Sequence, residues 1–343
     1  MVCPSVHGPG APTGVSAPDC AGPLEPGGRP ALSVVIPTRG PASRLRATLA
    51  CLAGAACAAP PFEVVLVDDT DDNSEGGRHP GAGPALVTVL ASAARWLPLR
   101  RVPGPRRGRA AARNTGAAAA LGSWLVFLDS DVLVGPGFLA RHAQAAAADV
   151  FVHGRMRELP TAERFLALVD SAGETAVQRA RTELVSGPDG PRSGTRDPRR
   201  RLVTNALERA IEQMADGTLP DVAPWLGCVG ANVAMAHTTW ATVGGFDEGF
   251  GRVWGCEDLE LGLRLYQAGF TRRLCPDALG IHLSHARPGR WEQHAENLDR
   301  FAELHPRPDV TALRALLGPT GTPGEYVRCV QAGGLPLPAG IPR

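Results

Sequence analysis

Two carboxylates in the segment Asp129-Ser130-Asp131 stand at the end of the apolar run Trp124–Leu128. An apolar run without polar alternation is typical of a strand that is buried on both faces. Side chains at i and i+2 of an extended chain point the same way, so Asp129 and Asp131 converge. A hard divalent cation with open positions for phosphate oxygens suits such a pair. The alternative is a loop in which an aspartate caps the next element, because short Asp-x-Asp matches are common.

A second acidic segment follows another apolar run, 62–67, where Asp68 and Asp69 end a predicted strand. The β-branched run Leu32–Pro37 precedes it, and an amphipathic helix with leucines at 45, 49 and 52 lies between the two. Strand, helix and strand in this order form a βαβ unit, which requires a parallel sheet. Carboxylates at the carboxyl end of such a strand can hydrogen-bond a ribose or a base edge, and a solvated acidic loop is the alternative.

Arginines gather between these two acidic strand ends. A basic cluster that faces carboxylates fits a diphosphate and its metal, whereas the alternatives are a solvated surface loop or a nucleic-acid contact. The formal net charge is only +1, the segment has few aromatic residues, and no nucleic-acid module is recognisable, so we expect no nucleic-acid partner. The cluster comprises Arg100, Arg101, Arg106, Arg107, Arg109 and Arg113.

The second half of the chain carries a further acidic pair, Glu257-Asp258. Adjacent acids at a helix start are favoured by the helix dipole, and the functional alternative is a general base. The leucines at 259, 261, 263 and 265 alternate strictly, which by period alone predicts a strand. Upstream, Asn232 lies inside the apolar run 225–235, where it is either a satisfied core residue or a ligand contact.

Two histidines, His282 and His285, follow near the end of the predicted core. In an extended chain they point to opposite faces, whereas in a turn both reach one ion. A lone histidine is more often structural, but with an Asp-x-Asp segment upstream one of the two could supply a third metal ligand.

The composition bounds the class of protein. The chain has 343 residues, 44% of them hydrophobic, which suits one large or two small domains. Its eight cysteines are scattered without a Cys-x-x-Cys pair, which indicates neither a zinc cage nor a disulfide framework. Because no signal peptide and no run of 18 apolar residues is present, we expect a cytoplasmic protein without a transmembrane segment.

The remaining segments give weaker predictions. Residues 1–30 and the last twenty-five are rich in proline and glycine, 85–90 favours a short strand, and 186–201 favours a linker. Helices are predicted at 138–148, 162–184, 202–215, 291–305 and 309–317, and a strand at 150–153.

Five motifs occur in an order known from one family. They are SVVIPTRG at 33–40, VVLVDD at 64–69, AARNTG at 111–116, LDSD at 128–131 and GGFDEGFGRVWGCEDLELGLRLYQAGF at 244–270. The chain resembles the GT-A-fold nucleotide-sugar glycosyltransferases, in particular family 2, over roughly residues 32–285. This resemblance implies an α/β fold with a Rossmann-like, mostly parallel central sheet flanked by helices. It also implies that a helix, not a strand, follows Glu257-Asp258.

The resemblance also implies a division of the chain and roles for single residues. Residues 31–135 would be the nucleotide-sugar-binding half, 136–290 the acceptor-binding half with a helical insertion at about 160–220, and 291–343 C-terminal helices and tail. Residues 1–30 are expected to be a disordered leader because of their composition. Donor-binding residues would be Pro37, Thr38, Arg39, Asp68, Asp69, Arg113, Asn114, Asp129 and Ser130. Mn²⁺ or Mg²⁺ would be held by Asp131, with Asp129 beside it and His285 or His282 completing the shell. Asp258 would be the base and Glu257 its catalytic neighbour, with Asn232 and Trp254 near the acceptor.

The expected function is therefore an inverting, metal-dependent glycosyltransferase. It would move a sugar from a nucleoside diphosphate donor, with a UDP-sugar favoured, to a hydroxyl of a small-molecule, peptide or glycan acceptor. Peripheral contact with a membrane stays open. One alternative is a nucleotidyltransferase, which usually carries a glycine-rich loop after the first strand, where this chain has only Thr38-Arg39-Gly40. Another alternative is a retaining enzyme that acts on peptides, although such enzymes have Glu-Asn in place of Glu257-Asp258. A third is a binding protein without catalysis.

Overall fold

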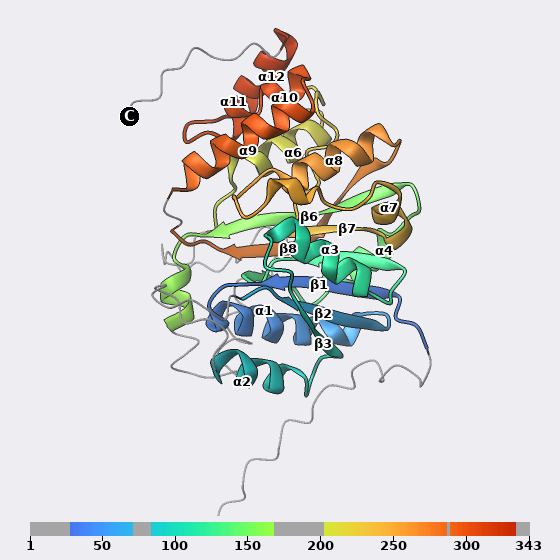
Figure 1. The fold of residues 1–343 in the computed structure, drawn as a ribbon. Helices are drawn as coiled ribbons and strands as arrows, with labels where there is room; N and C mark the ends of the chain where they lie inside the picture. Colours follow the sequence, from blue (N-terminus) through green and yellow to red (C-terminus); the bar gives the residue numbers. More distant parts are fainter. Residues whose placement is uncertain (1–27, 71–83, 168–201, 287–288, 334–343) are drawn as a thin grey trace, which may run out of the picture.

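A single sheet organises the part of the chain that the computed structural model describes, namely residues 28–70, 84–167, 202–286 and 289–333. Within these residues the sheet has eight strands in the order β3-β2-β1-β4-β7-β6-β8-β5 (Figure 1). The strands are β1 (Leu32–Thr38), β2 (Phe62–Asp68), β3 (Leu99–Pro103), β4 (Trp124–Leu128), β5 (Val132–Val134), β6 (Val150–Leu159), β7 (Asn232–Ala236) and β8 (Thr271–Leu283).

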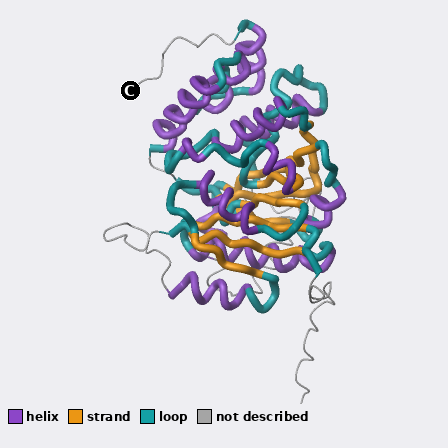
Figure 2. Tube along the Cα trace, turned by 45° about the vertical axis from the view of Figure 1, so that its right-hand side comes forward, coloured by secondary structure: helices purple, strands orange, loops and turns teal. Residues whose placement is uncertain are grey.

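Strands β1 to β4 form the parallel half of the sheet. Alternate side chains of β1 face opposite layers: Val34 and Ile36 pack with helix α1 (Ala42–Ala55), whereas Val35 packs with helix α3 (Arg109–Ala119). Both layers are visible in Figure 2, where helices lie on either side of the strands. Because these strands are parallel, their carboxyl ends, with Thr38, Asp68 and Asp129, lie along the same edge.

The other half of the sheet is mixed. Strand β7 runs antiparallel to both β4 and β6, β8 runs parallel to β6, and β5 closes the edge antiparallel to β8. In this register His282 of β8 lies opposite Glu158 of β6 on one side and Val132 of β5 on the other. The pairing therefore brings a histidine from late in the chain next to the Asp129-Ser130-Asp131 segment, which directly precedes β5.

A second hydrophobic core lies above the sheet, among the helices near the C-terminus (Figure 1). Trp225 is fully buried there, its indole Nε1 donating to Asp309 Oδ2 at 2.9 Å. The Tyr326 hydroxyl donates to the Asp309 carbonyl at 2.7 Å. The elements are α6 (Ala206–Ala215), α8 (Glu257–Gln267), α9 (Arg290–Leu304), α10 (Pro308–Thr311), α11 (Arg314–Leu317) and α12 (Pro323–Gln331).

Helix α8 lies between the two cores and explains the misleading alternation of its leucines. Leu259 and Leu263, one turn apart, pack into the C-terminal core, whereas Leu261 and Leu265 pack against the sheet. A helix that is buried on two opposite faces shows apolar residues at every second position without being a strand. The helix expected from the family resemblance is therefore confirmed, and the strand expected from the period is wrong.

Several other expectations can be compared with the structure. The mixed α/β class is confirmed, but 85–90 is not a strand: it lies in helix α2 (Pro84–Ala93). The helix expected at 138–148 is α4 (Phe138–Gln144), and 309–317 contains two short helices, α10 and α11. Helix α12 was not expected, because its segment is rich in glycine and proline. Three smaller elements complete the described chain: η1 (Ala56–Ala58), α7 (His237–Thr242) and η3 (Glu248–Phe250).

Some predictions fall outside the described residues. These are most of the leader, most of the helix at 162–184, and the linker at 186–201. The division of the chain at residue 135 stays a prediction, since β4 and β7 pair across it within one sheet. In the described residues, no helix combines the length and the apolar character that crossing a bilayer requires.

Candidate active site

Asp131, His282 and His285 form the candidate metal group, since one ligand atom of each lies within 4.8 Å of the others. Asp131 Oδ2 is 3.3 Å from His282 Nε2 and 3.6 Å from His285 Nδ1. Asp131 lies between β4 and β5, His282 is the last residue but one of β8, and His285 lies just after that strand. One carboxylate and two imidazoles are a donor set that divalent transition metals accept. Both histidines reach the same point, as the sequence allowed if the chain turns.

Glu158 of β6 contacts the ring nitrogen of His282 that does not face Asp131. Its Oε2 lies 2.7 Å from His282 Nδ1 and accepts a hydrogen bond of 2.6 Å from the Ser284 hydroxyl. A carboxylate on the far nitrogen of a metal-binding histidine fixes the ring orientation and leaves the other nitrogen for the metal. Glu158 lies outside the five sequence motifs and is 124 residues from His282, so no sequence pattern pointed to it.

Charges alternate within this cluster. Burial opposes the ionisation of Asp131, but hydrogen bonding and the charge of His282, followed by His285 and Arg109, hold the Asp131 pKa at about 2. Glu158 behaves likewise, with a pKa of about 2 because His282 and Ser284 outweigh burial. Burial lowers the pKa of His282, yet its two carboxylate partners raise it to about 10. The positive charge of a protonated His282 ring is therefore balanced by two carboxylates.

Asp129, predicted beside the metal, has a different partner. Its Oδ1 accepts a hydrogen bond of 2.9 Å from Arg113 Nη2, and it is not one of the three clustered ligands. Arg113 Nη1 donates to Glu257 Oε1 at 2.8 Å, and the guanidinium carbon lies 5.3 Å from the centre of the Phe246 ring. The structure thus joins Asp129 and Glu257 through one buried arginine.

Asp258 is the second residue of helix α8. Its Oδ2 accepts a hydrogen bond of 2.8 Å from the Gly230 amide, and its Oδ1 accepts one of 2.9 Å from the Leu259 amide. Burial and the neighbouring Glu257 carboxylate raise the pKa of Asp258 to about 6, against the opposing charge of Arg113. A carboxylate whose pKa lies close to neutral is suited to take up a proton during a reaction.

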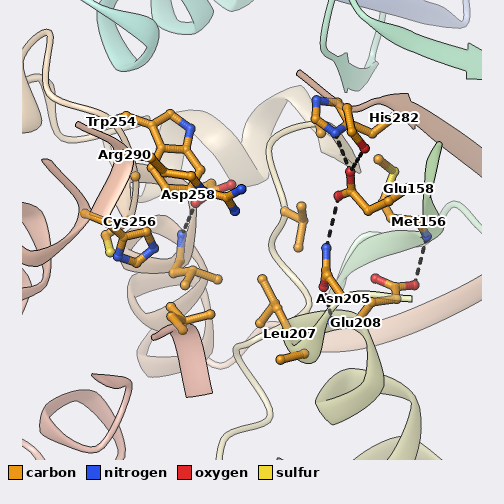
Figure 3. A pocket seen from close by; sticks show the side chains of 18 of the residues that line it. Met156, Glu158, Asn205, Leu207, Glu208, Trp254, Cys256, Asp258, His282 and Arg290 are labelled. Carbon is orange, nitrogen blue, oxygen red and sulfur yellow. Dashed lines mark hydrogen bonds and ion pairs between the residues drawn. The ribbon is translucent and has the colours of Figure 1, made fainter. Parts of the chain in front are cut away.

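One cavity of about 560 Å³ joins these parts. Its wall includes the three residues of the metal group together with Glu158, Glu257 and Asp258. Figure 3 shows Asp258 and Trp254 on one side of the cavity, and His282 with Glu158 on the other. A candidate base and a candidate metal group therefore face the same space.

The part of the wall beside Asp258 is aromatic and cationic. The Arg290 guanidinium lies 4.8 Å from the ring centre of Trp254 and 5.0 Å from that of Trp291. The Trp254 ring also meets His294 edge to face at 4.9 Å. Trp254, predicted to lie near the acceptor, is part of this wall, and its acceptor-binding role stays a prediction. Its neighbours Arg290, Trp291 and His294 were not expected.

The predicted nucleotide contacts lie at the carboxyl edge of β1 and β2. Thr38, Asp68 and Asp69 are buried, Pro37 is half-buried and Arg39 is exposed. Asp68 accepts hydrogen bonds from Arg101 Nε at 3.0 Å and from the Thr70 hydroxyl at 2.6 Å. The described residues that line the cavity do not include these five, so their donor-binding roles stay predictions.

Two further predicted site residues have structural partners. Asn232 is fully buried: its Oδ1 pairs with His142 Nε2 at 2.9 Å, and its Nδ2 donates to the Ala278 carbonyl at 2.8 Å. Asn232 thus has the partners of a satisfied core residue and is not among the described residues that line the cavity, so its acceptor-binding role stays a prediction. Asn114 holds the glycine-rich loop through Phe246, exchanging two hydrogen bonds of 2.9 Å with its backbone. Ser130, expected at the donor, is half-buried.

Two family models match segments of the chain that contribute residues to the cavity. Residues 33–164 match the model described as glycosyl transferase family 2, which covers Asp131 and Glu158. Residues 222–286 match the model described as the N-terminal domain of galactosyltransferase, which covers Asp258, His282 and His285. The chain is thus similar to family 2 glycosyltransferases in its first half and to a galactosyltransferase domain in its second, in agreement with its sequence motifs.

Curated relatives of the chain also carry glycosyltransferase names. Validoxylamine A glucosyltransferase of Streptomyces hygroscopicus subsp. jinggangensis is 33% identical over 288 residues, which are 81% of this chain and 61% of that protein. The uncharacterized glycosyltransferase YfnE of Bacillus subtilis is 27% identical over 272 residues, 74% of this chain and 64% of that protein. The chain thus spans less than two thirds of the length of either relative.

Solved structures resemble the chain more distantly. Mannosyltransferase PcManGT from Pyrobaculum calidifontis, in complex with GDP-Man and Mn²⁺, has a TM-score of 0.49 and 20% identity, covering 92% of this chain and 72% of that one. S. aureus TarS in complex with UDP-GlcNAc has a TM-score of 0.45 and 16% identity, covering 87% and 70%.

Proposed function

We propose that this chain transfers a sugar from a nucleoside diphosphate donor to an acceptor hydroxyl, with inversion and with the help of a divalent metal. The observation that carries the proposal is the single cavity that Asp258 shares with Asp131, His282 and His285. One side of this space offers metal ligands and the other offers a carboxylate with a pKa of about 6, raised by burial and by Glu257. Single displacement at an anomeric carbon needs these two functions on opposite sides of the sugar.

The chain's own residues would divide the work as follows. Asp258 accepts the proton of the acceptor hydroxyl as its oxygen bonds to the anomeric carbon. The bond from that carbon to the phosphate oxygen breaks, and its electron pair stays on the diphosphate. Arg109, which lines the cavity near Asp131, faces this developing negative charge. A bound metal would neutralise the same charge as a Lewis acid.

The residues present fit a transition-metal ion better than Mg²⁺. Two of the three clustered ligands are imidazoles, whereas Mg²⁺ prefers oxygen ligands. We therefore propose Mn²⁺ as the ion, held by Asp131, His282 and His285, with Glu158 orienting His282. Ion specificity is open to direct measurement, because binding can be followed in the absence of any sugar donor.

The relatives' names suggest which substrates to test. Validoxylamine A glucosyltransferase is named for glucosyl transfer to validoxylamine A. We propose that a glucosyl donor, with UDP-glucose tried first, and a polyhydroxylated small-molecule acceptor are suitable for this chain. Peptide acceptors form the contrasting panel, and the anomeric configuration of the product, read by NMR, separates inversion from retention.

The first experiment measures nucleotide and metal binding separately from turnover. Thermal unfolding is followed with UDP, GDP and dTDP, each with and without Mn²⁺, and Mn²⁺ binding alone is titrated calorimetrically. A ligand at 100 times its dissociation constant stabilises the fold by about 2.7 kcal/mol. We expect metal-dependent stabilisation by one nucleotide, its loss in Asp131→Ala, and Mn²⁺ binding weakened roughly 10- to 100-fold in Glu158→Gln.

The second experiment tests the base. Asp258→Asn keeps the shape of the side chain and should reduce transfer by roughly 10²- to 10⁴-fold while nucleotide binding persists. Unchanged turnover in this variant would exclude Asp258 as the base. Nucleotide stabilisation that is independent of metal would remove the proposed ion from the reaction, and pyrophosphate release from a nucleoside triphosphate would favour the nucleotidyltransferase alternative.

A further inference from the structure

The ion cluster of Arg113, Asp129 and Glu257 is the feature that the proposed reaction does not yet explain. Arg113 lies in α3 and is only 2% exposed, yet it contacts carboxylates 16 and 144 residues away in the sequence. Its two terminal nitrogens each donate to one carboxylate, at 2.9 Å and 2.8 Å. Hydrogen bonds between ionised partners are among the strongest in proteins, so this guanidinium fixes both acids in place.

The surroundings of Arg113 leave little space for a phosphate. The Phe246 ring covers the guanidinium from one direction, with its centre 5.3 Å from Cζ. Gly230 approaches so closely that a Cβ atom there would lie 2.6 Å from Arg113 Cζ. Although Arg113 reaches the cavity wall, both terminal nitrogens already have carboxylate partners. This occupancy argues against the diphosphate-binding role expected from the sequence.

Arg109 lies one helical turn before Arg113 and has the opposite character. It is half-buried, lines the cavity, and within the described part of the chain has no hydrogen bond or ion pair to a carboxylate. Its charge lies near Asp131 and Glu257. Burial raises the pKa of both carboxyl groups, and Arg109 helps their hydrogen-bonding partners to lower it. An arginine beside the metal group that pairs with no carboxylate of the described residues is suited to meet an anion.

We propose that Arg113 is a positioning residue that holds Glu257 beside Asp258, and that Arg109 is the arginine that meets the donor diphosphate. The proposal deepens the proposed function and rests on it. Glu257 then acts through its charge and its fixed place next to the base, and does not itself exchange a proton. Asp129 serves the same cluster from the side of the central strand, which links the metal segment to the start of α8.

Paired variants separate the two arginines. We expect Arg109→Gln to weaken binding of the nucleotide with Mn²⁺ by roughly 10- to 100-fold, since a hydrogen bond to a charged group is lost. Arg113→Lys should leave this affinity within about threefold but lower kcat by roughly 100-fold, because a lysine cannot bridge both acids. Equal loss of nucleotide affinity in both variants, or an unchanged affinity in Arg109→Gln, would overturn the proposal.

A charge-specific readout tests the link from Glu257 to Asp258. Glu257→Gln keeps an oxygen for Arg113 and removes one negative charge. The titratable and charged groups around Asp258 are Glu257 on its own helix, Arg113 of α3, and the thiols of Cys228 and Cys256. Loss of the neighbouring negative charge lowers the Asp258 pKa, so the acid limb of kcat/KM should move to lower pH by about one unit.

Glu260→Gln is the matched control. Glu260 lies on the same helix, is 3% exposed and pairs with Arg264 Nε at 2.7 Å. Its substitution should leave the acid limb in place, and an equal shift in both variants, or none in Glu257→Gln, contradicts the positioning role. If Arg113→Lys does not fold by circular dichroism, the Arg109→Gln and Glu257→Gln results decide. If the wild type binds no nucleotide and transfers no sugar, both the proposed function and this inference are rejected. If the wild type is active but the Arg109, Arg113 and Glu257 variants do not behave as expected, only the inference is rejected.

Discussion

Asp258 combines two requirements that conflict within one carboxyl group. A base in the proposed reaction must be ionised near neutral pH, yet burial and the Glu257 charge disfavour the ionised form. The pKa of Asp258 therefore rises from 3.8 to about 6 in the folded protein, and the folded state binds this proton more tightly than the unfolded state does. The cost of ionisation is fully present above about pH 6 and disappears as the pH falls toward 4.

Asp258→Asn should therefore stabilise the protein at the expense of activity. We expect a gain in unfolding free energy of at most about 3 kcal/mol at pH 7.5. The gain should fall to about 1 kcal/mol at pH 4.5, where the aspartate is protonated in the folded wild type but still mostly ionised in the unfolded chain. Urea unfolding at the two pH values measures the difference.

The control for this prediction has the opposite sign. Hydrogen bonds from Gly249 and Arg300 outweigh burial and lower the pKa of Asp247, so its ionised form stabilises the fold. Asp247→Asn should lose stability at pH 7.5. If both variants change in the same direction, the raised pKa of Asp258 is not the cause.

At the scale of elements, α3 depends on a close approach to the sheet. Gly116 lies against β1 and β2: a Cβ atom there would be 2.4 Å from Val35 Cγ1 and 2.8 Å from Val67 Cγ2. A larger residue must push the helix away from the strands, and α3 also carries Arg109 and Arg113 into the cavity wall. The glycine in the motif AARNTG thus has a packing role.

Gly116→Val should lower the unfolding free energy by about 1–3 kcal/mol or more through overpacking. It should also weaken nucleotide binding, because the shifted helix carries Arg109 with it. Ala118→Val, on the exposed side of the same helix, provides the comparison and should change stability by no more than about 0.5 kcal/mol. Thermal unfolding of both variants checks the prediction, and equal destabilisation would point to the β-branched residue itself.

The elements also show where sequence patterns stop being informative. The strands β1, β2 and β4 were predictable because each is an apolar run that ends at a turn or at carboxylates. Helix α2 was taken for a strand because a short apolar run such as ALVTVL has no period that separates the two. The alternating leucines of α8 misled for another reason, since only the tertiary structure reveals that this helix is buried on two sides.

The same limit applies to the site. Asp131, His282, His285 and Asp258 were predictable, because each belongs to a segment with chemical character or a family motif. Glu158 was not, since its role depends on the register of β6 against β8. Arg113 was predicted near the diphosphate, but its bonds to Asp129 and Glu257 were not, because a sequence does not show which carboxylates reach a buried arginine.

At the scale of the whole molecule, Asp309 joins the C-terminal helices to the segment before β7. Its carboxylate accepts the Trp225 indole proton and pairs with Arg307, and its carbonyl accepts the Tyr326 hydroxyl proton. Trp225 and Tyr326 are both fully buried, so loss of the carboxylate leaves an indole N–H without its partner.

Asp309→Ala should cost about 1–3 kcal/mol of unfolding free energy. Asp299→Ala is the comparison: that carboxylate pairs with Arg314 at the surface, and exposed ion pairs contribute about 0–1 kcal/mol. Chemical denaturation followed by tryptophan fluorescence measures both. A loss in Asp299→Ala as large as that in Asp309→Ala would show that Trp225 is not the reason.

The cavity takes its walls from two separate cores, and this division has an evolutionary consequence. The sheet and its connections supply Asp131 and His282, whereas helix α11 supplies Leu316 and Leu317. Mutations in the helical core can therefore reshape the space beside Asp258 without changing the residues of the proposed metal group. Homologues with this fold can therefore keep the same reaction while they change the acceptor. Laboratory selection for new acceptors should concentrate its mutations in α6 and α11.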